Sequence, residues 1–240
     1  MTGAAGRLGR CLWQAWEKAG HYDLTLVDKL PVEGARSRVE VGDLFDRDFT
    51  DRICVGQDVV VALAYVASEE KTFDPGAGTD IAMNMQLFEA CRRAAVGRIV
   101  FASSNHATGW NEQTRERPFL SSPEEYNPTG WYGAMKGMAE LAGKALVNTA
   151  SMRFVGIRIG FFYGHAEPDS LRACEALLAP EDAVQLFALA VDYQGPQRYL
   201  VTYGTSETGG HGNLDIGPAR RELGYRPAVD LVTARRKYRP

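Results

Sequence analysis

A tyrosine and a lysine four positions apart are the first residues in this sequence that could do chemistry. They lie in Tyr132-Gly133-Ala134-Met135-Lys136, where a helix places both side chains on one face. A free tyrosine has a pKa of about 10, so a phenol that acts as a base near neutrality needs that pKa lowered by roughly 2–3 units. A neighbouring ammonium and a cationic ring both favour the phenolate. The pair therefore predicts a tyrosine base assisted by Lys136, although this spacing also occurs by chance in many helices.

Polar side chains follow an apolar segment upstream of this pair. Residues 97–103 read as a buried strand, and Ser104, Asn105 and His106 come directly after it. Sites form at the carboxyl ends of parallel strands. Ser104 could polarise a substrate hydroxyl or carbonyl and share its proton, and Asn105 could bind further hydroxyls. The alternative is that these residues cap the strand end. His106 either supports the loop or touches substrate, and the sequence has no G-x-S-x-G elbow of a serine hydrolase.

The chain opens on three glycines that run into a helical pattern: Gly3, Gly6 and Gly9. Such glycines allow a tight turn and a close approach to a pyrophosphate, which the helix N-terminus attracts. Asp28 ends the next strand, where an acid would hydrogen-bond the adenosine ribose. A carboxylate there disfavours a 2′-phosphate, which predicts NAD rather than NADP, and Asp43-Leu44 could hold the adenine. Ordinary turns and a capping aspartate are the alternative.

One feature does not fit a dinucleotide fingerprint, because only Met1 and Thr2 precede Gly3. The strand expected there is central, and burying five apolar residues is worth about 7–15 kcal/mol. That is as large as the net stability of a whole domain. We therefore expect a preceding N-terminal segment to supply the strand. The alternatives are that another segment fills the slot or that the protein is impaired.

The rest of the chain alternates between two kinds of segment. Short runs rich in Val, Ile, Leu and Phe, typical of strands covered on both faces, occupy residues 22–28, 38–42, 58–64, 97–103, 153–160 and 198–204. Helical patterns occupy residues 7–19, 79–95, 131–150 and 181–192. This alternation predicts a parallel sheet with helices on both sides. The polar stretch at 105–129 is long for a plain connection, which favours a functional loop.

Composition excludes several classes. The chain has 240 residues, of which 45% are hydrophobic and 24% charged, as in ordinary globular proteins. A net charge of -3 argues against a nucleic-acid partner. We see no membrane span and no secretion signal, so a cytoplasmic protein is expected. The four cysteines are scattered, so neither a disulfide scaffold nor a metal site is expected.

The motifs together resemble the extended short-chain dehydrogenase/reductase family, also known as the NAD-dependent epimerase/dehydratase family. The features that carry the likeness are TGAAGRLG, Asp28, Asp43-Leu44, FASSNH, YGAMK and the late RRELGYRP. The resemblance implies a doubly wound α/β Rossmann fold with an NAD-binding domain at 1–160. A small substrate-binding portion at 161–240 would pack on it as one compact unit. The helices at 79–95 and 131–150 commonly pair between subunits of this family, which implies a homodimer or higher homo-oligomer.

Within the family, IVFASSNH, Arg158-Ile159-Gly160 and Glu167-Pro168 followed by Arg172 are similar to the uronate dehydrogenases. This implies that Arg172 clamps a substrate carboxylate, because a guanidinium matches it bidentately. A solvated surface role for Arg172 is the alternative. The implied catalytic residues are Tyr132, Lys136 and Ser104, and the implied substrate ligands are Ser104, Asn105, His106 and Arg172. The implied NAD contacts are Gly3, Gly6, Arg7, Leu8, Gly9, Asp28, Asp43, Leu44, Leu63, Ala64, Tyr132 and Lys136.

Several residues depart from the family pattern. Tyr65 is bulky beside the expected cofactor, where relatives have a small residue. Asp80 stands where an asparagine is usual, and a carboxylate there alters the local charge. Phe161 and Phe162 occupy a stretch where uronate dehydrogenases present a substrate-binding serine.

Three functions follow from these observations. The first is NAD-dependent oxidation of a hexuronic acid, of the glucuronate or galacturonate type, at the anomeric carbon to an aldarolactone. The second is a nucleotide-sugar epimerase or dehydratase, which would need a larger C-terminal pocket. The third is a dinucleotide-binding regulatory protein without turnover. Net release of NADH separates the first from the second, and an intact Tyr132, Lys136 and Ser104 argue against the third.

Overall fold

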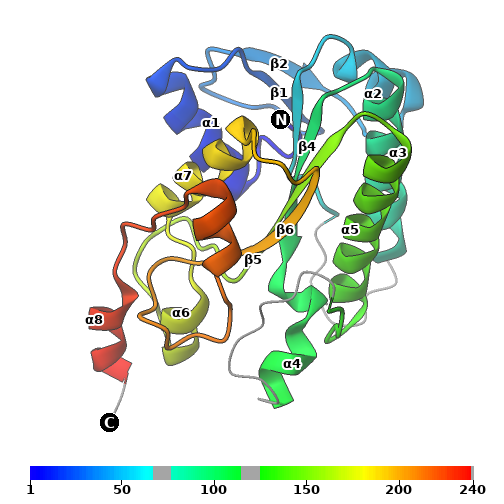
Figure 1. Ribbon diagram of the computed structural model, residues 1–240. Coiled ribbons are helices and arrows are strands. Elements are labelled where there is room, and N and C mark those ends of the chain that lie inside the picture. Colours follow the sequence, from blue (N-terminus) through cyan, green and yellow to red (C-terminus); the bar gives the residue numbers. More distant parts are fainter. Residues whose placement is uncertain (67–76, 115–124, 239–240) are drawn as a thin grey trace.

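A parallel sheet separates two layers of helices in the computed structural model, which describes residues 1–66, 77–114 and 125–238 (Figure 1). The strands are β1 (Thr25–Asp28), β2 (Arg38–Val41), β3 (Val59–Ala62), β4 (Arg98–Ser104), β5 (Arg153–Ile159) and β6 (Tyr199–Gly204). The helices are α1 (Arg7–Ala19), α2 (Arg47–Cys54), α3 (Ala77–Arg93), α4 (Gly109–Thr114), α5 (Trp131–Thr149), α6 (Leu171–Ala176), α7 (Pro180–Asp192) and α8 (Leu231–Arg235). Short 3₁₀ helices are η1 (Asn105–Ala107) and η3 (Arg236–Tyr238), and η2 (Ala219–Leu223) is a π-helix. The predicted doubly wound α/β Rossmann fold is confirmed.

The sheet is built in two parts that Thr2 joins. Within the described residues, β1 pairs with β2, and the other part runs in the order β3-β4-β5-β6, all parallel. Thr2 forms one-residue bridges to Val27 of β1 and Ala62 of β3. Its N–H donates to the Val61 carbonyl at 2.9 Å, and the Val27 N–H donates to the Met1 carbonyl at 2.8 Å. Met1 and Thr2 therefore lie where a central strand is expected, and the ladder there is as short as the sequence indicates.

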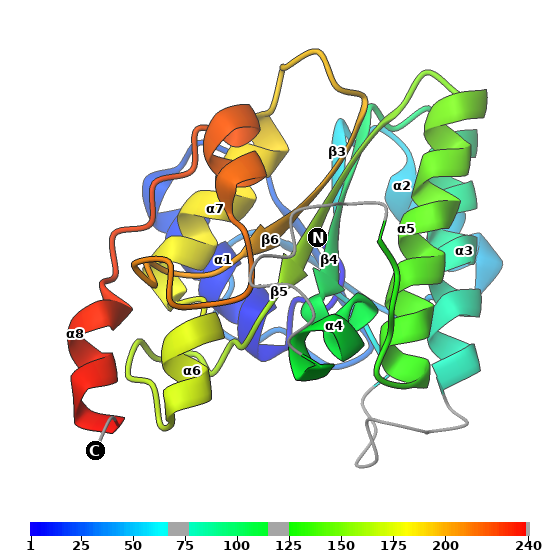
Figure 2. The same ribbon diagram turned by 60° about the horizontal axis from the view of Figure 1, so that its bottom comes forward.

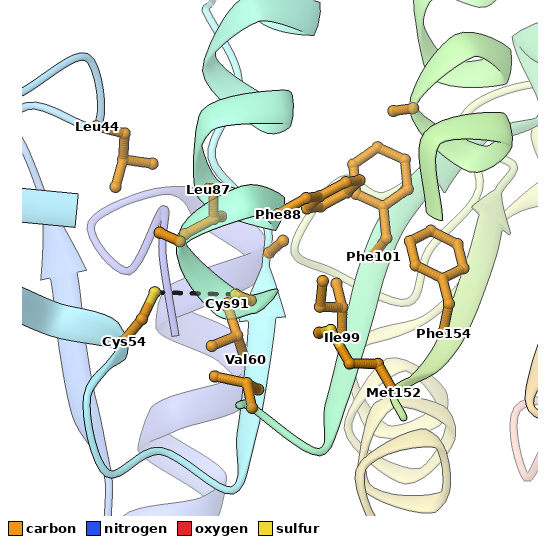
Figure 3. Packing of buried hydrophobic residues seen from close by; sticks show 14 of the residues in the cluster. Leu44, Cys54, Val60, Leu87, Phe88, Cys91, Ile99, Phe101, Met152 and Phe154 are labelled. Atoms are coloured by element: carbon orange, nitrogen blue, oxygen red, sulfur yellow. Dashed lines mark hydrogen bonds between the residues drawn. The ribbon is translucent and has the colours of Figure 1, made fainter. Parts of the chain in front are cut away.

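Both faces of the sheet are covered, which explains the apolar character of its strands. On one face α2, α3 and α5 enclose a core in which the rings of Phe88, Phe101 and Phe154 lie 5.8–6.0 Å apart (Figure 3). On the other face α1 and α7 enclose a second core that includes Leu12 and Phe187. All seven residues of β4 are buried. A strand buried on both sides cannot alternate polar with apolar side chains.

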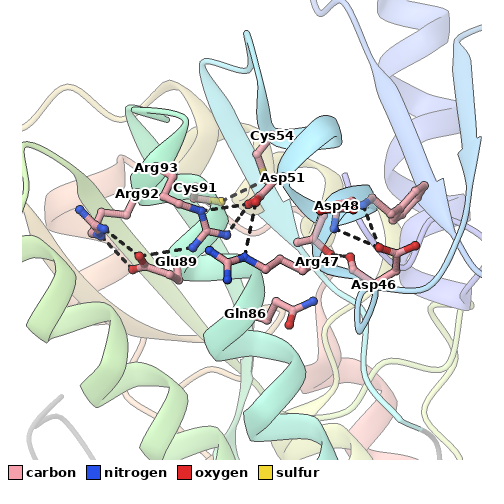
Figure 4. A network of polar contacts seen from close by, with 12 residues as sticks. Asp46, Arg47, Asp48, Asp51, Cys54, Gln86, Glu89, Cys91, Arg92 and Arg93 are labelled. Atoms are coloured by element: carbon pink, nitrogen blue, oxygen red, sulfur yellow. Dashed lines mark hydrogen bonds and ion pairs between the residues drawn. The ribbon is translucent and has the colours of Figure 1, made fainter.

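Local signals set the helix boundaries. Helix α1 ends at Gly20, whose φ of 72° suits glycine and places its N–H on the Trp16 carbonyl. Helix α7 begins at Pro180, as expected. The sequence analysis missed α2, α4, α6 and α8, because helices of five to eight residues show too little periodicity. Asp46 was the available signal for α2, since its carboxylate accepts the Asp48 and Phe49 N–H groups (Figure 4).

The remaining boundaries differ from prediction by a few residues. The strand expected at 22–28 begins only at Thr25, and the helix expected at 79–95 runs from Ala77 to Arg93. Exposed ion pairs reinforce the outer layer, where Arg93 of α3 contacts Asp51 of α2 and Arg92 contacts Glu89 (Figure 4). No helix in the described part of the chain is long and apolar enough to cross a membrane.

A buried ion pair ties α5 to β5. The Arg158 guanidinium donates to the Glu140 carboxylate at 3.0 and 2.7 Å, and both side chains are fully buried. Ser103 of β4 donates to the same carboxylate. The guanidinium also lies between the rings of Tyr126 and Tyr203, at 5.2 and 5.6 Å from their centres. The pair thereby fixes α5 against the sheet.

The glycine-rich turn brings the start of α1 close to the end of β3. Gly3 has a φ of 71°, and a Cβ on it would lie 2.7 Å from the Ala64 nitrogen and 2.8 Å from the Leu63 carbonyl carbon. On Gly9, a Cβ would lie 2.3 Å from the Gly3 carbonyl oxygen. Only glycine fits at these two positions, which explains the spacing seen in the sequence.

The Glu140–Arg158 pair should dominate stability over any exposed pair. We expect Glu140→Gln to lower the free energy of unfolding by about 3–5 kcal/mol, because it leaves a buried guanidinium without its counter-ion. The control Glu89→Gln weakens two exposed ion pairs, with Arg92 and Arg93, and should cost less than about 1 kcal/mol. Urea denaturation measures both, and equal effects would contradict the importance of the buried pair.

Two effects make glycine necessary at position 3: the positive φ and the close approach of the backbone at Leu63 and Ala64. A comparison with Gly20 separates them. Gly20 has almost the same φ, 72°, but a Cβ there would meet no atom within 4 Å. We expect Gly20→Ala to destabilise by about 1 kcal/mol and Gly3→Ala by about 2–4 kcal/mol, because only the latter adds overlap with backbone. Thermal unfolding of the two variants tests this, and equal losses would mean that the turn can yield.

Candidate functional site

The catalytic candidates meet where β4 ends and α5 begins. Ser104 is the last residue of β4, and Tyr132 lies in the first turn of α5. The helix can approach because of Gly133, where a Cβ would lie only 2.0 Å from the His106 carbonyl oxygen. The Ser104 hydroxyl lies close enough to the Tyr132 phenol to lower the pKa of Tyr132. The structure therefore brings together the serine and tyrosine that the sequence placed on separate elements.

Lys136 lies one turn further along α5 with its ammonium buried. Its Nζ donates to the Ala102 carbonyl at 3.1 Å and lies 4.0 Å from the Asp80 carboxylate. It also lies 4.9 Å from the ring centre of Phe101 and 5.7 Å from that of Tyr132. Burial lowers the pKa of Lys136, and the charge of Asp80 opposes that shift. Burial likewise raises the pKa of Asp80, against the effect of Lys136.

The electrostatics of Tyr132 differ from the expectation of a lowered pKa. The pKa of Tyr132 is raised to about 12, mainly by burial and further by the charge of Asp80, against the effect of the nearby Ser104 hydroxyl. Burial is the main reason for the difference, because it disfavours the charged phenolate. The Asp80 carboxylate adds to it and also lies 4.0 Å from the ammonium that was expected to favour the phenolate. The protein groups alone therefore keep Tyr132 protonated at neutrality.

The substrate-binding candidates form a chain of contacts beside this pair. The Asn105 amide donates to Glu112 of α4 at 2.9 Å, and the Ser104 hydroxyl donates to the Asn105 amide oxygen at 3.4 Å. Glu112 forms an ion pair with Arg172 of α6, whose guanidinium lies 5.6 Å from the ring centre of Phe161. Burial lowers the pKa of Arg172. Arg172 is thus linked to Asn105 through Glu112, with 39% of its side chain exposed. Figure 2 shows α4 and α6 at the same end of the molecule.

His106 lies against the edge of Tyr132. Their ring centres are 5.6 Å apart, and the His106 Nδ1 lies 3.0 Å from the Thr129 hydroxyl. The backbone N–H of His106 donates to the Ser104 oxygen at 3.2 Å. These contacts show that His106 supports the loop, and they leave its predicted contact with substrate as a prediction.

The residues expected to hold NAD fit a dinucleotide. Helix α1 starts at Arg7, and its N-cap residue Gly6 has no side chain to cap it, so the first N–H groups, including those of Arg7 and Leu8, can meet an anion. The Asp28 carboxylate accepts the N–H groups of Ala5 at 2.9 Å and Leu30 at 3.0 Å. Its oxygens retain lone pairs for ribose hydroxyls. Asp28 is thereby fixed directly beside the glycine turn.

The other residues expected to contact NAD differ in their positions and in their exposure. Leu63 and Ala64 adjoin Gly3, as a shared cofactor surface requires. Asp43 is exposed and accepts the Phe45 N–H at 2.9 Å. Leu44 is buried in the core between α2 and α3 (Figure 3), so its side chain does not face a cofactor. A contact between Leu44 and the adenine would therefore have to come from the backbone of Leu44.

The residues that depart from the family pattern surround the tyrosine. The ring of Tyr65 lies edge-on to Tyr132 with centres 6.3 Å apart, and it is 48% exposed, so it can rotate without leaving a buried hole. Asp80 accepts the Val66 N–H at 2.8 Å and so fixes the chain after β3. Phe161 packs under Arg172, and Phe162 packs toward the α1 and α7 core.

Sequence reasoning missed Glu112 and Thr129. Both lie in the polar stretch at 105–129, of which residues 115–124 lie outside the described part. An acid in a polar loop carries no spacing signal. Its contact with Arg172 arises only because α4 and α6 pack at the same end of the sheet.

Comparisons with known proteins identify relatives of this chain. The chain is 31% identical over 210 residues to a uronate dehydrogenase of Pseudomonas syringae pv. tomato, covering 86% of this chain and 74% of that protein. It is 29% identical over 250 residues to an NAD-dependent glucose-6-phosphate dehydrogenase of Haloferax volcanii, covering 95% and 91%. The crystal structure of uronate dehydrogenase from Agrobacterium tumefaciens superposes with a TM-score of 0.84 at 27% identity, covering 98% and 86%.

The pattern of one family spans most of the chain, since the NAD dependent epimerase/dehydratase family matches residues 1–180. The predictions of an NAD-dependent oxidoreductase acting on a CH–OH group, and of NAD as its cofactor, are confirmed at this level. The chain belongs to the NAD dependent epimerase/dehydratase family.

Proposed function

We propose that this protein oxidises a hexuronic acid, of the glucuronate or galacturonate type, at the anomeric carbon to give an aldarolactone. The observation that carries the proposal is the line of contacts from Ser104 through Asn105 and Glu112 to Arg172, which begins beside the Tyr132 phenol. It joins a group able to take a proton to a cation able to bind a carboxylate. The likeness to uronate dehydrogenases supports the same substrate class.

The residues present divide the chemistry among themselves. The protein groups alone keep Tyr132 protonated, and its phenolate would be favoured by the positive ring of bound NAD. The phenolate takes the proton of the anomeric hydroxyl, and Ser104 helps to hold that hydroxyl in place. The glycine turn and Asp28 would hold NAD, which supplies the acceptor for the hydride of the anomeric carbon. Lys136 keeps a positive charge close to the Tyr132 ring and favours the phenolate as the proton leaves. Arg172 orients the substrate through its carboxylate.

The division of the chain and its assembly are part of the proposal. Residues 1–160 would bind NAD, and residues 161–240, which contribute Arg172, would complete the substrate pocket. A homodimer through α3 and α5 is supported by exposed apolar side chains on these helices: Met85, Trp131, Met138 and Leu141.

Tyr132→Phe tests the chemistry of the site. We expect NADH formation from glucuronate or galacturonate to fall by about 10²–10⁴-fold, because general base assistance is lost. Tyr22→Phe is the matched control, since Tyr22 bonds Asp192 far from the site and its loss should leave the rate unchanged. The rate is followed by NADH absorbance. Absence of uronate turnover while another sugar is oxidised would refute the substrate; sugar conversion without net NADH would favour an epimerase.

Asp80→Asn tests the electrostatics of Tyr132. The phenolate is the reactive base, so the rate rises with pH as Tyr132 loses its proton. The charge of Asp80 raises the pKa of Tyr132, so removing that charge should move the rising limb of the pH–rate profile toward lower pH. Glu89→Gln, an exposed change on the same helix, is the control. Movement toward higher pH would instead mean that Asp80 acts mainly by keeping Lys136 protonated.

A further inference from the structure

Glu112 is a buried acid whose contacts the proposed chemistry does not yet explain. Its side chain is 5% exposed, whereas that of Arg172 is 39% exposed. One carboxylate oxygen accepts the Asn105 amide at 2.9 Å, and the other meets the Arg172 guanidinium. The acid therefore touches two of the groups expected to bind substrate, one on each side.

The ion pair changes what Arg172 offers to a substrate. A guanidinium with no counter-ion would present a full positive charge and would strongly favour an anionic sugar. With Glu112 beside it, the net charge of the pair is zero, so the attraction for a substrate carboxylate is reduced. A neutral sugar is then no longer penalised for leaving a desolvated cation unpaired.

The guanidinium still has donors for a second acceptor. It carries five N–H groups in a fork, and Glu112 is met by Nη2. A substrate carboxylate would thus share Arg172 with Glu112 and would lie close enough to feel its repulsion. Two unit charges several ångströms apart near a protein surface repel by energies that correspond to about tenfold or more in affinity.

We propose that Glu112 is a specificity-determining residue: its charge reduces the preference of the enzyme for a sugar acid over the neutral aldose of the same configuration. The proposal rests on the proposed function, since it concerns the substrate of the same site. It predicts an enzyme that accepts both D-glucuronate and D-glucose, with a ratio of kcat/KM set by the Glu112–Arg172 pair.

Glu112→Gln tests this directly. The change keeps an amide oxygen for Asn105 but removes the charge, so the ratio of kcat/KM for D-glucuronate over D-glucose should rise by about tenfold. The matched control is Glu167→Gln, which removes the same charge from a side chain 91% exposed and five positions from Arg172 in the sequence. Its ratio should stay at the wild-type value.

Two further variants keep the test decisive. Arg172→Gln leaves Glu112 facing the substrate alone, so the ratio should fall below the wild-type value. In the double variant Glu112→Gln with Arg172→Gln, this ratio should rise part of the way back to the wild-type value. The same series is measured by equilibrium binding of the two sugars to the NADH-loaded protein, in which the sugar is not oxidised because NADH cannot accept its hydride.

The outcomes separate the two proposals. An unchanged or lower ratio in Glu112→Gln, in a wild type that oxidises glucuronate, overturns the role of Glu112 and leaves the proposed function standing. A wild type that uses only the neutral sugar, with glucuronate oxidation gained in Glu112→Gln, overturns the proposed substrate and supports Glu112. Failure of every variant to bind either sugar overturns both.

Discussion

The ammonium of Lys136 is the charge around which the site is organised. A lysine 4% exposed is stable only if other groups replace its water, and here the Ala102 carbonyl, the Asp80 carboxylate and the surrounding rings do so. These partners come from β4 and α3, whereas Lys136 belongs to α5. Satisfying one buried charge therefore fixes three elements relative to one another. Tyr132, one turn earlier on α5, meets Ser104 as a consequence.

A second buried charge strengthens the same arrangement. Glu140 lies one turn beyond Lys136 on α5 and is held by Arg158 of β5 and Ser103 of β4. Lys136 and Glu140, on the same side of the helix as Tyr132, thus each contact the sheet. The helix cannot rotate or slide without breaking all of them. Such rigid placement is what a proton transfer requires of its donor and acceptor.

Much of the fold and of the candidate site could be predicted from the sequence, because the sequence patterns that indicate them are local. The apolar run of β4, the spacing of Tyr132 and Lys136, and the glycines before α1 each depend on neighbouring residues alone. What could not be predicted depends on contacts between distant segments. The pairing of Glu112 with Arg172 and the effect of Asp80 on Tyr132 follow from the packing of separate helices. The burial of Leu44, expected at the adenine, arises from contact with α3, which no local pattern encodes.

The two parts of the sheet meet through Thr2 alone among the described strands and bridges. Asp28, expected at the ribose, belongs to the smaller part, while Ser104 and the helix bearing Tyr132 belong to the larger. A dinucleotide bound to both parts of the sheet would hold them together. Its binding energy would then contribute to cohesion as well as to recognition. The folded fraction of this protein would accordingly track the supply of its own coenzyme.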